Sequence, residues 1–194
     1  MTVTDKMYPV VGACGLDCVL CPRYYTEGKS RCGGCGSAYS YAAVGCKIFR
    51  CCVKEKCFET CAECSDFSCS KFEGIDNYDS FTTHRKMMPN LRFIKKRGIT
   101  EFLNGQKKRQ KLLEQMLRQF NEGRSRSLHC VVAALLPIKV LKKSLDLAKR
   151  RVKEEGVMNN DLRSKAKILK NILNEVVSKE LIDLNLRKHA DLKK

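Results

Sequence analysis

The 194-residue sequence has no apolar run long enough to cross a lipid bilayer. A membrane-spanning helix needs about 20 consecutive apolar residues, and the longest run here, residues 130–136, ends at Pro137. The first residues, MTVTDKMYPVV, also lack the apolar core of a signal peptide. We therefore expect a soluble cytoplasmic protein without membrane binding, in a compartment where thiols stay reduced.

Motifs for common catalytic chemistry are missing as well. The sequence contains no P-loop for phosphates, no dinucleotide-binding fingerprint and no convincing catalytic triad. Aromatic residues are few beyond Ser80 and do not alternate with the basic runs, which gives little support to base stacking. These absences leave enzymatic activity open and favour a binding role.

Cysteine, in contrast, is abundant and concentrated. Twelve of the thirteen cysteines lie between Cys14 and Cys69. Such a density is typical of secreted disulfide scaffolds, but the odd total, the close pairing and the missing signal peptide oppose that interpretation. Closely spaced reduced thiols favour metal binding instead.

Two cysteine pairs form the most specific motif. Cys18-Val-Leu-Cys21 is followed after ten residues by Cys32-Gly-Gly-Cys35-Gly. A two-residue gap lets both sulfurs of a pair reach one ion, and the glycines let the chain curl around it. Four thiolates are the closed tetrahedral ligand set of a structural zinc site.

A second group of cysteines extends from residue 46 to residue 69. Cys61 and Cys64 form another pair, best completed by Cys46 and Cys51, while the remaining cysteines join a third site or exchange with these. The sequence thus predicts two or three zinc ions, with ligands from Cys14, Cys18, Cys21, Cys32, Cys35, Cys46, Cys51, Cys61, Cys64 and Cys69. The weaker candidates, as extra ligands or reactive thiols, are Cys52 and Cys57.

An iron–sulfur cluster is the alternative to zinc, because thiolates suit both. The spacing Cys14-x3-Cys18-x2-Cys21 is that of radical enzymes that cleave S-adenosylmethionine. Those enzymes need alternating strands and helices after the motif, whereas further cysteines and then helices follow here. The alternative is therefore an iron–sulfur protein for electron transfer or sulfur handling.

Positive charge is unevenly placed along the chain. Residues 1–70 carry eight Lys and Arg against seven Asp and Glu, a net charge of +1, whereas residues 71–194 carry thirty against fourteen, a net charge of +16. The basic runs could contact the phosphate backbone of a nucleic acid, with binding that weakens steeply as salt rises. They could equally be solvated helix faces that offset the thiolates, since twelve thiolates on three divalent ions would bring residues 1–70 to about −5. The other expected partner is a protein of unknown identity.

A short polar segment between two expected helices is a candidate anion site. It consists of residues Arg124, Ser125, Arg126 and Ser127. Two arginines and two hydroxyls before a helix start would suit phosphate or sulfate. Ordinary helix capping by Ser127 explains the serines equally well.

Apolar residues recur at helical spacing from Thr100 onward. We expect helices that end near Gly123, Pro137 and Gly156, and a last helix that begins at Asn160 or Asp161. The alternating segment LIDLNLRK, residues 181–188, is expected to form a short strand, and Cys130 is expected in the core. The predicted fold is mostly α, with an irregular, metal-stapled cysteine-rich module over residues 1–72 packed on a basic helical domain over residues 73–194.

Several segments resemble a known family. They read CGLDCVLCPRYY, CGGCG, CKIFRC, CAECSDFSCSKF, NLRFIKKRGITEFL and FNEGRSRSLHCVVAALLPI. Together they are similar to the cysteine-rich domain-of-unknown-function family 3795 of bacteria and archaea, and the similarity covers most of the chain. It implies a metal role for the ten cysteines named above, whereas Cys52 and Cys57 depart from the family pattern. Two sites with two neighbouring thiols thus have at least as much support as three sites.

Overall fold

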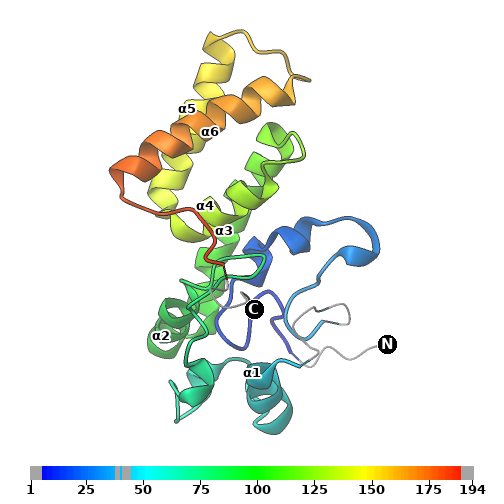
Figure 1. Ribbon diagram of the computed structural model, residues 1–194, viewed down its shortest axis with the longest axis vertical. Helices are drawn as coiled ribbons and strands as arrows, with labels where there is room; N and C mark the ends of the chain where they lie inside the picture. The colour runs from blue at the N-terminus through cyan, green and yellow to red at the C-terminus, as the bar shows by residue number, and fades with distance from the viewer. Residues whose placement is uncertain (1–5, 38–39, 41–44, 189–194) are drawn as a thin grey trace, which may run out of the picture. The chain divides into compact units, whose positions relative to one another are not determined.

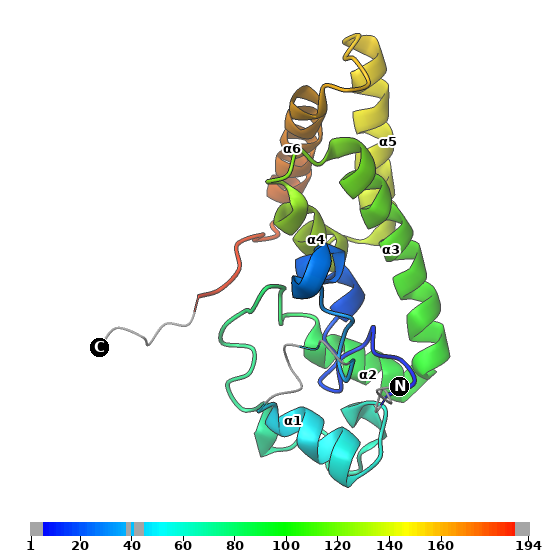
Figure 2. The ribbon, with the colours of Figure 1, turned by 90° about the vertical axis from the view of Figure 1, so that its right-hand side faces the viewer.

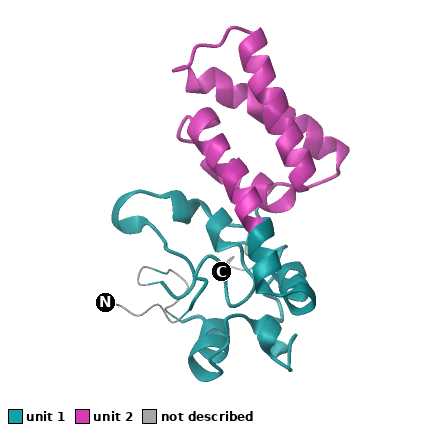
Figure 3. Ribbon diagram, turned by 180° about the vertical axis from the view of Figure 1, so that it is seen from behind, with its two compact units in different colours: residues 1–105, 186–194 teal, residues 106–185 magenta. Residues whose placement is uncertain are grey.

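The computed structural model describes residues 6–37, 40 and 45–188, and these residues are mostly helical. They contain no strand; an isolated antiparallel bridge joins Val11 and Asp17. Contacts divide the chain into two compact units, residues 1–105 with 186–194 and residues 106–185 (Figure 3). The first is called unit 1 and the second unit 2, and each is described by itself.

The cysteine-rich part of unit 1 consists of short helical turns joined by irregular chain (Figure 1). Pro22 begins one of them, since its fixed φ suits the first helical position. Thr60 begins another, and its backbone N–H donates to Glu63 Oε1 at 2.7 Å. The turns are η1 (Cys18–Leu20), η2 (Pro22–Tyr25), η3 (Gly28–Ser30), α1 (Lys47–Phe49) with its π-helical continuation η4 (Arg50–Glu55), η5 (Cys61–Glu63) and η6 (Ser70–Phe72).

Unit 1 is closed by helix α2 (Met87–Arg97), which packs against η5. Its buried residues, Met87, Leu91 and Ile94, recur at spacings of three and four and so share one face. A side chain at Gly15 would collide with the backbone of Met87, so only glycine permits this close approach, at a φ of +82°. The cysteine-rich turns and α2 therefore share one hydrophobic core, which includes cysteine side chains.

Unit 2 is built from long amphipathic helices. It comprises the later part of α3 (Ile99–Phe120), then α4 (Arg126–Leu135), α5 (Ile138–Glu154) and α6 (Leu162–Lys179), of which α5 and α6 pack together (Figure 2). Buried apolar residues from every helix fill its core, among them Leu113, Met116, Phe120, Cys130, Leu141, Leu145, Leu169 and Leu173. The helical stripes expected from the sequence are confirmed. No helix among the described residues is both long and apolar enough to span a membrane.

Two local expectations are wrong. Residues 181–188 form no strand, because they form no ladder with another described segment. Asp79 instead donates its backbone N–H to Arg187 O and accepts the Arg187 N–H at its carboxylate, both at 2.8 Å. Ser127 does not cap α4, which already begins at Arg126. Ser125 occupies the cap position, and its hydroxyl donates to Glu122 Oε1 at 2.9 Å rather than to the helix. Asp161 caps α6 as expected, since its carboxylate accepts the Ser164 N–H at 3.0 Å.

Candidate metal centre

The two cysteine pairs of the most specific motif lie around one cleft of unit 1. This cleft has a volume of about 270 Å³ and is lined by Cys18, Cys21, Cys32 and Cys35. Gly34 sits between the last two with a φ of +101°, where any side chain would collide with the backbone of Pro9. Cys35 then donates its backbone N–H to Pro9 O at 2.8 Å. The glycine thus folds the Cys32–Cys35 turn back onto the chain that precedes the first cysteine.

Backbone amides point at the sulfurs of this region. The Ala13 N–H donates to Cys35 Sγ at 3.5 Å, and the Phe49 N–H donates to Cys46 Sγ at 3.4 Å. Backbone N–H groups near the sulfurs of Cys14, Cys18 and Cys21 partly offset the rise in the pKa of these thiols. Donors around a sulfur stabilise its thiolate form, which is the form that binds metal.

A second cavity collects most of the later cysteines. It encloses about 120 Å³, and its sulfur-bearing wall consists of Cys51, Cys52, Cys61, Cys64 and Cys69. Phe58, Phe67 and Phe72 form the aromatic part of the remaining wall, which also includes the exposed residues Lys56 and Asp66. The spacing of Cys61 and Cys64 therefore does place both thiols beside one cavity, together with Cys51 and Cys69.

Three predicted ligands line neither cavity. Cys14 and Cys46 lie near each other and near Cys35, close enough for their charges to interact. The structure thus places Cys46 with the first group of cysteines, whereas sequence spacing assigned it to Cys61 and Cys64. Cys57 is exposed, and its φ of +54° turns the chain out of η4.

Several of the clustered thiols resist ionisation. Burial, together with the neighbouring sulfurs of Cys35 and Cys46, raises the pKa of Cys14 to about 12. Burial also raises the pKa of Cys18 and of Cys35. In the second cavity, a hydrogen bond between the thiols of Cys52 and Cys61, followed by burial, raises the pKa of Cys61. Crowded thiols of this kind become thiolates together only when a cation lies among them.

Two lysines supply positive charge next to these sulfurs. Lys6 is buried, and its ammonium group lies near Cys35 and Cys52. Lys56 donates to Cys64 Sγ and to Asp66 Oδ2, both at 3.1 Å. Hydrogen bonds to Cys64 and Asp66 raise the pKa of Lys56. Sequence reasoning missed both residues, because a single lysine outside a periodic pattern gives no signal of its position in the fold.

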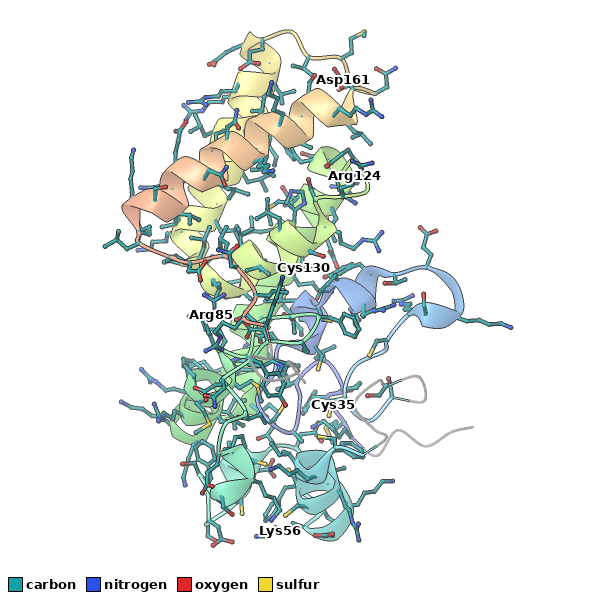
Figure 4. All side chains as sticks on the ribbon, in the orientation of Figure 1. Cys35, Lys56, Arg85, Arg124, Cys130 and Asp161 are labelled. Atoms are coloured by element: carbon teal, nitrogen blue, oxygen red, sulfur yellow. The ribbon has the colours of Figure 1, made fainter. Side chains whose placement is uncertain are left out.

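The donor set suits zinc by its chemistry, although the side chains are not arranged around an ion. All twelve clustered cysteines carry free thiols, and Figure 4 shows sulfur atoms gathered near Cys35. In the described part of the chain, no three or more Cys, His, Asp or Glu side chains converge in a metal-binding arrangement. Binding would therefore require rotation of several cysteine side chains into the cavities that they line.

The candidate anion site lies in unit 2, apart from the cysteines in sequence. Arg124 and Ser125 line a large cleft there, whereas Arg126 and Ser127, the first residues of α4, are not among its lining residues. Cations of α6 form much of the remaining lining. Sequence reasoning missed these cations, because α6 shows them only as the polar side of an amphipathic pattern.

Comparisons with protein-family models, with curated proteins and with solved structures found no match to this chain. The similarity to family 3795 therefore stays an expectation that depends on the cysteine motifs.

Proposed function

We propose that this protein binds zinc through the clustered cysteines of unit 1 and acts as a zinc-stabilised binding module for a protein partner in a reducing compartment. The observation that carries the proposal is the cleft lined by Cys18, Cys21, Cys32 and Cys35, together with the backbone N–H groups that donate to Cys35 Sγ and Cys46 Sγ. Such donors offset the charge of metal-bound thiolates and fix the loops around them.

The first site would use the four cysteines of the 270 Å³ cleft, and the second would use Cys51, Cys61, Cys64 and Cys69. Cys14 and Cys46 supply the ligands for a third ion or an exchange with the first site. Bound zinc would contribute folding free energy, which in small zinc peptides is about 10–16 kcal/mol. Unit 1 needs such a contribution, because its short turns bury few large aliphatic side chains.

An iron–sulfur cluster is the second candidate, and the second cavity is where it has support. Five cysteines there share a wall with three phenylalanines, and cysteine thiolates are the usual ligands of such a cluster. Zinc is favoured over it, because the glycine-containing Cys32–Cys35 turn and the amides around the first cleft match a mononuclear thiolate site.

Anaerobic purification followed by metal analysis and a visible absorption spectrum distinguishes the two candidates. We expect a colourless protein with two or three zinc ions per chain. A brown protein that contains iron and acid-labile sulfide would overturn the zinc proposal. A metal-free but folded unit 1 would overturn both.

Single variants assign the ligands. Cys32→Ser should lower the zinc content and unfold unit 1, because one of the four sulfurs of the first cleft is lost. Cys57→Ser is the matched control in the same unit, because Cys57 is exposed and lines neither cavity. Cys130→Ser, in the core of unit 2, should also keep the wild-type zinc content.

A further inference from the structure

One large cleft in unit 2 has cations at four of its eight lining residues. Its volume is about 810 Å³, within the range of small-molecule sites. Arg124 comes from the segment before α4, and Arg163, Lys167 and Lys170 come from α6. These residues are about 40 positions apart in the sequence, so the fold has brought two separate groups of positive charge to one concave surface.

The three cations of α6 form a row on one face of the helix. Arg163, Lys167 and Lys170 are spaced by four and then three residues, and all are exposed. Seven residues of helix span about 10 Å. None of the three forms a salt bridge with a described residue, so their charge is available to a bound anion.

Glu122 is the acidic residue of the lining. Burial alone would raise the pKa of its carboxyl, but the Ser125 hydroxyl, its own backbone N–H and the positive charge of Arg124 hold that pKa below the usual value. Glu122 is therefore ionised at neutral pH. Four cations against one carboxylate leave the cleft with a net charge of +3, inside a unit that carries nineteen Lys and Arg against nine Asp and Glu.

We propose that this cleft binds a small molecule that carries a short chain of phosphate groups. A row of cations about 10 Å long matches several linked phosphates better than a single anion, because each phosphate can face a different side chain. The lining contains no aromatic residue on which a base could stack. The phosphates therefore provide most of the binding affinity, and a nucleoside attached to them adds little to it. The proposal does not depend on zinc, because the clustered cysteines all belong to unit 1.

Titration calorimetry of the full-length protein with sodium tripolyphosphate tests this proposal. We expect saturable binding with one ligand per chain, weaker binding as salt rises, and a similar affinity for ATP, whereas orthophosphate should bind far more weakly. The variant Lys167→Ala/Lys170→Ala should weaken tripolyphosphate binding about tenfold, because two exposed charge contacts are lost.

The matched control is Lys142→Ala/Lys143→Ala, which removes the same charge from exposed positions of α5 outside the cleft. It should leave the affinity nearly unchanged. Equal weakening by both double variants would overturn the proposal, because binding would then follow net charge instead of the cleft. No measurable tripolyphosphate binding would also overturn it, and so would tight, Lys167-dependent binding of single-stranded RNA alone, since the ligand would then be a nucleic-acid backbone.

Discussion

The ammonium group of Lys6 lies 3.0 Å from Glu59 Oε1, across 53 residues of the cysteine-rich part of the chain. Lys6 also donates to the backbone carbonyl of Glu59. The carboxylate in turn accepts the Tyr8 N–H at 2.7 Å and the Met7 N–H at 3.0 Å. The Lys6–Glu59 pair thus connects the segment before the first cysteine to the loop that precedes Cys61.

Loss of this cation should destabilise unit 1. In Lys6→Met the carboxylate of Glu59 stays largely buried without its cation, so we expect the free energy of unfolding to fall by about 3 kcal/mol. Denaturant unfolding followed by circular dichroism measures the change. Arg50→Met is the control, because Arg50 and Glu55 form an exposed pair at 3.2 Å and its loss should cost less than about 1 kcal/mol. Equal losses in the two variants would show that burial of the Lys6 pair has no energetic effect.

The buried histidine of α4 should make unit 2 sensitive to acid. His129 is fully buried, and neither ring nitrogen has a hydrogen-bond partner among the described residues. Burial lowers the pKa of His129 from 6.5 to about 4. Between these values the unfolded chain binds a proton that the folded protein does not, so stability falls as pH falls from 6.5 to 4, by about 3 kcal/mol in total.

The variant His129→Leu isolates this effect, because other groups titrate equally in both proteins. The difference in unfolding free energy between the variant and the wild type should shift in favour of the variant as pH falls from 7 to 4. A difference that stays constant over this range would contradict a buried neutral imidazole.

The first turn of α6 should depend on one carboxylate. Asp161→Ala removes the acceptor of the Ser164 N–H and should lower the free energy of unfolding by about 1 kcal/mol. Ser127→Ala is the comparison, since Ser127 lies exposed inside α4 and caps nothing. We expect its effect to stay within about 0.5 kcal/mol. A larger loss from Ser127→Ala than from Asp161→Ala would reverse the capping assignments.

Metal removal should affect the two units differently. A strong zinc chelator should increase amide hydrogen exchange over residues 14–69, because the loops there would lose their metal-bound thiolates. Helices α5 and α6 should keep their protection, since their core is made of aliphatic side chains. Uniform loss of protection along the chain would show that unit 2 cannot stay folded without metal.

The sequence predicted the helices of unit 2 because their apolar residues repeat over three or more turns. Helix α2 was missed, although Leu91 and Ile94 follow the same spacing. Pro89 interrupts the pattern, but it lies in the first turn, where the proline lacks only an N–H that the helix does not use. At residues 181–188 the sequence instead predicted an element that does not form. Apolar and polar residues alternate there, but a strand needs another strand with which to pair.

Cysteine spacing predicted correctly which cysteines lie together within one turn. It predicted less well which of these turns lie close to one another. The pairs at 18–21, 32–35 and 61–64 lie together because two intervening residues leave little freedom. Cys46 was assigned to the later pair by order along the chain, yet it lies near Cys14. The cations of the unit 2 cleft were equally hidden, because their meeting depends on how α4 and α6 fold together.

The bond between Asp79 and Arg187 has a consequence for how the chain is made. Asp79 is buried and accepts hydrogen bonds from the backbone and the guanidinium group of Arg187, and both residues belong to unit 1. A ribosome synthesises all of residues 106–185 between them. Unit 1 therefore gains this contact only after unit 2 has been synthesised, and the Asp79 carboxylate of a nascent chain lacks its guanidinium partner until residue 187 emerges.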